Sequence, residues 1–118
     1  MTRTRAVFAG FFIVTGILHF VVPRFFVQIV PSYLPAPRAL VAVSGAAEIA
    51  GGIGILSRRW RAAAGIGLIM LLVAVFPANV EMLRQARARD ASPLFRAALW
   101  LRLPVQAVLI WMAWRLRR

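Results

Sequence analysis

The sequence predicts an all-α fold, an integral membrane four-helix bundle in which residues 1–118 form a single transmembrane domain. Three observations lead to this prediction. Hydrophobic residues make up 62% of the chain, and the mean hydropathy is +0.80, whereas soluble domains are about half apolar. Four apolar runs approach the length of about 20 residues that a helix needs to cross a bilayer. The linkers after the second and third runs are short, which favours antiparallel neighbours.

The four predicted spans are bounded by proline or arginine. They cover approximately residues 6–22, 39–57, 62–82 and 93–114. The first span stops at Pro23, and the second is closed by Arg58. The fourth is the least regular span, because Arg96 and Arg102 interrupt its apolar run.

A short interfacial or re-entrant segment is expected between the first two spans. Residues 24–37 read RFFVQIVPSYLPAP, which is apolar and aromatic but too short to cross a membrane. Pro31, Pro35 and Pro37 prevent one continuous helix there. Such a segment would lie over one end of the bundle, although an ordinary hydrophobic loop explains the same residues equally well.

The charged residues indicate a lipid bilayer as the partner and exclude nucleic acid. All fifteen basic residues are arginines, against three acids, for a net charge of +12. The arginines lie mostly between the apolar runs, as expected for loops that touch anionic lipid head groups. Eight flank the spans on the side of the two termini and six on the other side. This bias predicts that both termini are cytoplasmic in the plasma (bacterial inner) membrane.

Polar residues from all four spans are predicted to meet in the half of the bundle away from the termini. At a rise of about 1.5 Å per residue, Glu48 is about 14 Å deep and Arg102 about 13 Å deep, which predicts an ion pair between them. His19 and Asn79 lie nearer the surface, and Gln106 lies one turn further in. Charged groups inside a membrane are costly and usually functional. Arginine cannot become neutral, whereas a glutamic acid can.

Structural roles for the same five residues stay open. An ion pair inside a bundle can simply fix the register of two helices. Asn79 can satisfy backbone groups freed by Pro77, and Gln106 can do the same around Pro104. No metal site is expected, because one histidine and three acids are too few to build one.

Four blocks of the chain resemble the DoxX family of small four-span membrane proteins. The blocks read GILHFVVPRF, SGAAEIAGGIGIL, VFPANVEM and LWLRLPVQAVLIWMAW. The resemblance implies a redox accessory protein linked to quinone or thiol chemistry, and distant relatives include assembly factors. By the family pattern, the positions to watch are His19, Glu48, Asn79, Arg102 and Gln106. The chain has no cysteine, so a thiol mechanism is excluded.

The first function expected is therefore a redox-associated accessory subunit. It would bind a quinone-type or other lipophilic ligand in a polar pocket in the outer half of the bundle. One alternative is a non-enzymatic assembly protein that packs beside a larger membrane complex. A second alternative is a small oligomeric transporter or channel. The sequence names no certain cofactor beyond a candidate quinone, and it leaves open a membrane protein partner, a homo-oligomer and any catalysed reaction.

Overall fold

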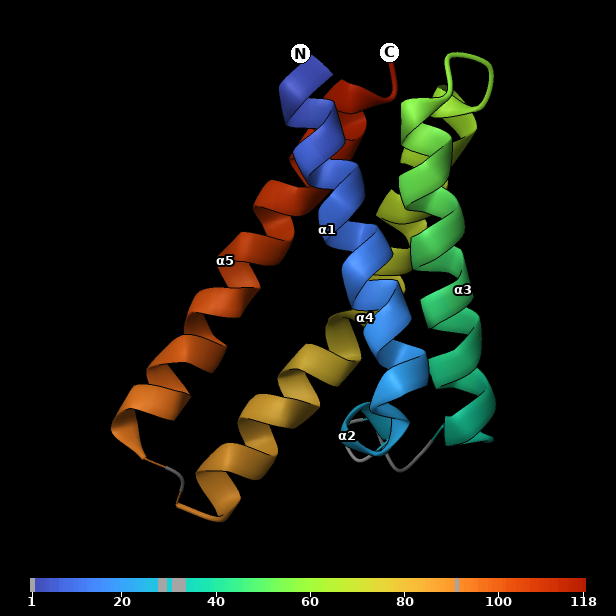
Figure 1. The fold of residues 1–118 in the computed structure, drawn as a ribbon. Coiled ribbons are helices and arrows are strands. Elements are labelled where there is room, and N and C mark those ends of the chain that lie inside the picture. Colours follow the sequence, from blue (N-terminus) through green and yellow to red (C-terminus); the bar gives the residue numbers. More distant parts are fainter. Residues whose placement is uncertain (1, 28–29, 31–33, 91) are drawn as a thin grey trace.

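Four long helices and one short helix make up the computed structural model, which describes residues 2–27, 30, 34–90 and 92–118 (Figure 1). The elements are α1 (Thr2–Val21), α2 (Pro23–Val27), α3 (Pro37–Leu56), α4 (Arg61–Ala88) and α5 (Pro93–Leu116). The described residues contain no strand, which confirms the predicted all-helical fold. The four long helices are each long and apolar enough to cross a membrane.

The helix ends differ from the predicted spans in ways that local chemistry explains. α3 begins at Pro37, since proline suits the first turn of a helix. α4 runs six residues beyond the predicted end at Met82, because Pro77 does not end it and the residues that follow favour a helix. The chain turns at Asp90, which has a φ of 52°. α5 begins after Ser92, whose hydroxyl accepts a hydrogen bond from the Phe95 N–H.

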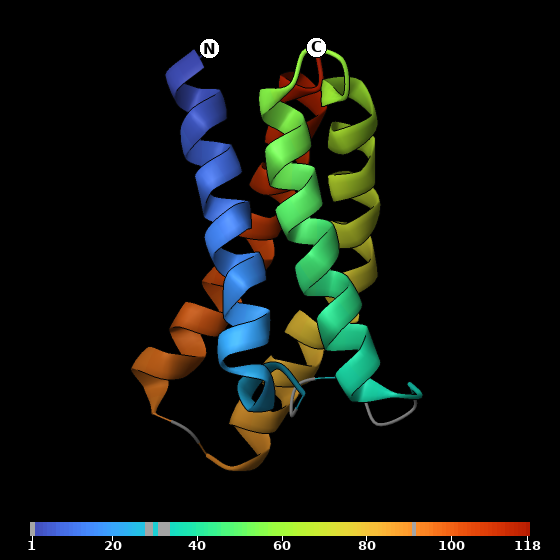
Figure 2. The same ribbon diagram turned by 45° about the vertical axis from the view of Figure 1, so that its right-hand side comes forward.

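The segment between the first two long helices is only partly described. α2 forms the five-residue helix that follows Val22, and its N-terminal residue is Pro23. The predicted interfacial or re-entrant cap also includes residues 28–29 and 31–33, which lie outside the described residues. α2 packs against both α1 and α3 at the end of the bundle away from the termini (Figures 1 and 2).

The helices pack in chain order, with α1 against α3, α3 against α4 and α4 against α5. One buried cluster near the termini joins Phe8 and Phe12 of α1 to Leu68 of α4 and Leu116 of α5. A second cluster at the opposite end joins Met82 and neighbouring residues of α4 to Leu99 of α5. α1 and α5 lie close together near the termini and diverge toward the other end of the bundle, so that the beginning of α5 stands apart from the end of α1 (Figure 1).

Glycines let α1 and α3 approach to backbone contact. A Cβ placed on Gly16 would lie 2.7 Å from the backbone oxygen of Gly45. A Cβ on Gly52 would lie 2.8 Å from the backbone oxygen of Ala9. Small residues allow such a close approach between helices, and here it brings α1 beside Glu48, whose Cβ would lie 3.1 Å from a Cβ on Gly16.

The proline in α4 coincides with a change in the direction of this helix. Pro77 lies inside α4, where it has no N–H to offer the carbonyl of Val73. Both views show that the second half of α4, which leads to the beginning of α5, is inclined relative to the first half of α4 (Figures 1 and 2). Such kinks are expected at a proline, and this one widens the bundle at the end where the polar residues lie.

Each long helix also presents large apolar side chains to the outside. Examples are Val7 of α1 at 74% exposure, Val43 of α3 at 66%, Met70 of α4 at 68% and Leu101 of α5 at 63%. Soluble monomers rarely expose contiguous apolar patches on this scale. These exposed apolar side chains fit a lipid environment better than an aqueous one.

Arg5 connects the first and last helices, and replacing it should weaken the end of the bundle near the termini. Its guanidinium donates to the carbonyls of Leu116 at 3.4 Å and Arg118 at 3.1 Å, at the negative end of α5. We expect Arg5→Gln to lower the free energy of unfolding by about 1 kcal/mol in detergent micelles. Arg3→Gln is the control, because Arg3 is exposed. Equal effects of both variants would contradict this role for Arg5.

Candidate functional site

A cavity of about 220 Å³ lies in the half of the bundle away from the termini. All five helices contribute to its wall, which is mostly apolar and includes Phe26, Val41 and Pro77. Its polar lining residues are His19, Ser44, Glu48, Asn79 and Arg102. Four of the five residues singled out in the sequence therefore line one cavity, next to the bend of α4.

His19 and Glu48 form the closest polar contact across the α1–α3 crossing. The His19 Nδ1 atom lies 3.2 Å from Glu48 Oε2, and the two side chains are only 11% and 16% exposed. The same Nδ1 is 2.7 Å from the carbonyl oxygen of Thr15. Because a carbonyl can only accept, Nδ1 carries a hydrogen. The imidazole ring stacks on Phe26 of α2, with ring centroids 3.9 Å apart and planes inclined by 17°.

The hydrogen on His19 Nδ1 is directed to Thr15, which leaves Glu48 incompletely satisfied. Glu48 Oε2 is buried and has no hydrogen-bond partner of normal geometry in the described part of the chain. A buried acceptor in this condition costs free energy unless a donor reaches it. Glu48 is one of the residues that line the cavity, so a donor that reaches its carboxyl group from there would satisfy it.

The predicted ion pair between Glu48 and Arg102 is wrong, since Glu48 lies beside His19 and the other acid–base contact of the described residues joins Glu81 to Arg84. The prediction compared only the depth of each Cα atom along its helix. It did not consider that side chains in a helix point toward the N-terminus of that helix. Gly16 packs beside Glu48 and Gly45 beside His19, which puts His19 and Glu48 about one helical turn apart in level. Because α1 and α3 are antiparallel, the two side chains lean toward each other across that difference.

Arg102 instead extends toward the end of the bundle. Its Nη1 atom donates to the Met82 sulfur at 3.7 Å, which is a weak contact for a cation. No carboxylate lies at ion-pair distance from Arg102 within the described residues. The guanidinium is largely exposed but lines the cavity. It is therefore a hydrogen-bond donor available to whatever occupies that space.

Gln106 lies behind the cavity wall and fastens α5 to α4. Its Oε1 atom accepts a hydrogen bond from the Asn79 side-chain amide, and its own amide donates to the carbonyl of Leu72. Gln106 is 5% exposed and is not part of the cavity lining. The sequence left open that Gln106 serves the backbone around Pro104. Its amide instead serves the helix that Pro77 bends.

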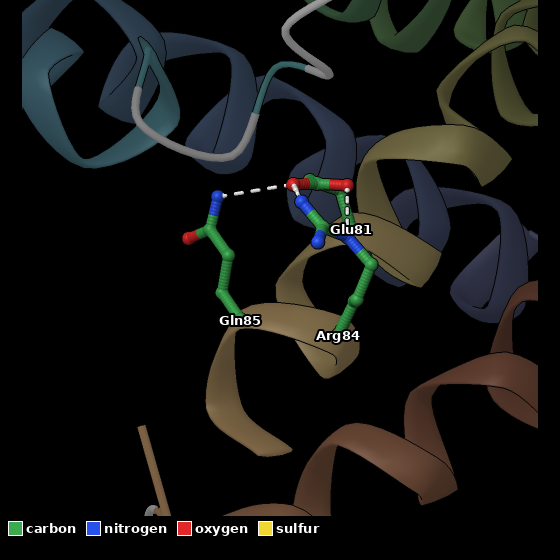
Figure 3. Close-up of polar contacts among 3 residues, drawn as sticks. All are labelled: Glu81, Arg84 and Gln85. Atoms are coloured by element: carbon green, nitrogen blue, oxygen red, sulfur yellow. Dashed lines mark hydrogen bonds and ion pairs between the residues drawn. The ribbon is translucent and has the colours of Figure 1, made fainter. Parts of the chain in front are cut away.

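The remaining acid of α4 is satisfied within its own helix. Glu81 accepts two hydrogen bonds from the guanidinium of Arg84, and the Gln85 amide donates to it at 3.4 Å (Figure 3). Because Arg84 and Gln85 already surround its carboxylate, Glu81 is not an acid partner for the cavity.

Phe26 and Ser44 line the cavity but were not among the five candidate site residues of the sequence. Phe26 belongs to the aromatic segment that was predicted to cover this end of the bundle, so its composition carried a usable signal. Ser44 lies one helical turn from Glu48 and lines the same space. The full site offers an acceptor at Glu48, donors at Arg102 and Asn79, and a flat aromatic surface at Phe26.

The fold and the site define a class of small helical proteins with four candidate membrane spans and a cavity that all five helices line. The chain belongs to a family described as a domain of unknown function, DUF8561, whose profile matches residues 8–117. No curated protein matches the sequence. No solved structure matches it either.

Proposed function

We propose that the chain is an integral membrane protein that binds a lipophilic ligand with a polar, ring-shaped head group. The membrane is the bacterial inner membrane, with both termini in the cytoplasm. The apolar exterior of all four long helices supports the membrane location. The arginine bias supports the orientation.

The single observation that carries the ligand proposal is the mixed lining of the cavity. Small-molecule sites are concave and mostly apolar, with a few converging polar groups. Here Glu48, whose Oε2 atom has no hydrogen-bond partner among the described residues, and Arg102 both line one space of about 220 Å³. That volume is below the usual range for a whole ligand. It suits one ring, while an apolar tail would extend between the helices.

A quinone-type head group fits this pattern. Its carbonyl oxygens accept hydrogen bonds, which Arg102 and Asn79 can donate. The hydroxyl groups of the corresponding quinol donate, and the Glu48 oxygen can accept. A role as a redox accessory subunit follows from this ligand together with the DoxX resemblance. In that role the chain positions the head group, and electrons come from a partner redox protein.

The test is whether the purified protein carries and binds such a molecule. Extraction with organic solvent and mass spectrometry should recover a lipophilic quinone from protein purified in mild detergent. A short-chain benzoquinone in excess should raise the melting temperature of ligand-stripped protein by roughly 5 °C. Arg102→Gln should weaken binding of the quinone about tenfold, since it removes a charged donor. Glu48→Gln should weaken binding of the corresponding quinol about tenfold, since it removes a charged acceptor.

Arg87→Gln is the matched control, because Arg87 is an exposed arginine near the same end of the bundle. It should leave quinone binding unchanged. A protein from which no lipophilic ligand is extracted, and whose melting temperature does not respond to the quinone, would contradict the proposal.

The two other functions expected from the sequence stay predictions. An assembly role predicts that cross-linking in native membranes captures the chain beside a larger complex. A transport role predicts flux into liposomes that depends on Glu48. Neither result would require the cavity to hold a quinone.

A further inference from the structure

A second cavity, of about 490 Å³, lies beside the first at the end of the bundle away from the termini. It is formed by the last turn of α1, by α2 and by the beginning of α3. Phe20, Pro23, Val27 and Ala42 give it an apolar wall.

Two arginines also line this second cavity. Arg24 lies on α2 and Arg38 on the first turn of α3, and both are exposed. The ion pairs of the described residues use Glu48 and Glu81, and their basic partners are His19 and Arg84. Arg24 and Arg38 thus have no carboxylate at ion-pair distance in the described part of the chain. The partial positive charge at the start of α3 adds to the charge of Arg38.

We infer that this second cavity binds one anionic phospholipid, with its phosphate between Arg24 and Arg38 and an acyl chain along the apolar wall. Guanidinium groups match phosphate oxygens with a forked pair of N–H donors. A free anion would leave the wall formed by Phe20, Val27 and Ala42 in contact with water. A lipid satisfies both the two charges and the apolar surface at once.

The position of the cavity agrees with this occupant. Arg24 and Arg38 lie at the ends of α1 and α3, which is the level of the head groups if the chain crosses the bilayer as proposed above. The inference rests on that membrane location and not on the ligand of the inner cavity. His19 and Val41 line both cavities, so the lipid would border the quinone-type ligand.

The experiment compares the purified chain in nanodiscs of phosphatidylcholine alone and of phosphatidylcholine mixed with phosphatidylglycerol. The anionic lipid should raise the melting temperature by roughly 5 °C. The double variant Arg24→Gln/Arg38→Gln should lose most of this shift. High salt should also reduce the shift in the wild-type chain, because exposed charges are screened.

Arg58→Gln/Arg59→Gln is the matched control, since these two arginines are exposed at the opposite end of the bundle. It should keep the lipid shift, and an equal loss would overturn the inference. Equal melting temperatures in the two lipid mixtures would overturn it as well, even if the Arg24 and Arg38 variant does not fold. If glycerol phosphate reproduces the full shift in phosphatidylcholine, the site takes a free phosphoester and the lipid assignment is wrong.

Arg102→Gln separates this inference from the proposed function. This variant should lose quinone binding and keep the response to phosphatidylglycerol. If the lipid response disappears with Arg102, the two cavities do not act as separate sites.

Discussion

Replacing Gly16 with leucine should destabilise the bundle by about 3 kcal/mol. A side chain at this position has no room, because its Cβ would lie 2.7 Å from both the Gly45 backbone oxygen and the Ile49 Cγ1 atom. The isoleucine can rotate, but the carbonyl can move only with the whole of α3. The two helices must therefore separate, and the measurement is the unfolding free energy in detergent.

Gly10→Leu is a matched control on the same helix. A Cβ on Gly10 meets nothing within 4 Å, so this variant should be neutral or more stable, because leucine favours a helix by roughly 1 kcal/mol over glycine. Gly16→Leu should also weaken quinone binding, since the same crossing brings His19 to Glu48. Equal stability of the two variants would mean that α1 and α3 do not pack through Gly16.

The helices were predictable because a bilayer imposes a length that appears directly in the sequence. Four apolar runs of suitable length, separated by arginines and prolines, indicated the four long helices, and the structure confirms them. The ends were less certain, since proline begins one helix at Pro37 but leaves another unbroken at Pro77. At Pro37 the missing N–H falls in the first turn, where it would be unpaired anyway, whereas inside α4 Pro77 removes the hydrogen bond to the Val73 carbonyl and the helix bends there.

Depth along the helices predicted which residues share one end of the bundle but not which of them touch. His19, Glu48, Asn79 and Arg102 do line one cavity. Pairing also depends on the rotation of each helix and on the lean of each side chain. The glycine contacts between α1 and α3 fix how these two helices face each other. The depth of a residue along its span contains no information about such contacts. Arginine is long enough to reach away from its own level, and Arg102 does so by turning toward Met82.

Replacing Gln106 with leucine should destabilise the bundle by about 1–3 kcal/mol, although the substitution makes a buried position more apolar. The amide of Gln106 joins the Asn79 side chain and the Leu72 carbonyl, and it is 5% exposed. Leucine fills a similar volume but removes the acceptor of the Asn79 amide and one donor to the Leu72 carbonyl in an apolar surrounding. The measurement is again the unfolding free energy in detergent.

A double-mutant cycle between Gln106→Leu and Asn79→Ala distinguishes this network from a local role near Pro104. If Gln106 and Asn79 act through their mutual hydrogen bond, the double variant should lose less stability than the sum of the single variants. The difference should be about 0.5–2 kcal/mol, as for other interhelical hydrogen bonds in membranes. Additive effects would place the cost of Gln106→Leu elsewhere. In that case Gln106 would act through its hydrogen bond to the Leu72 carbonyl and not through Asn79.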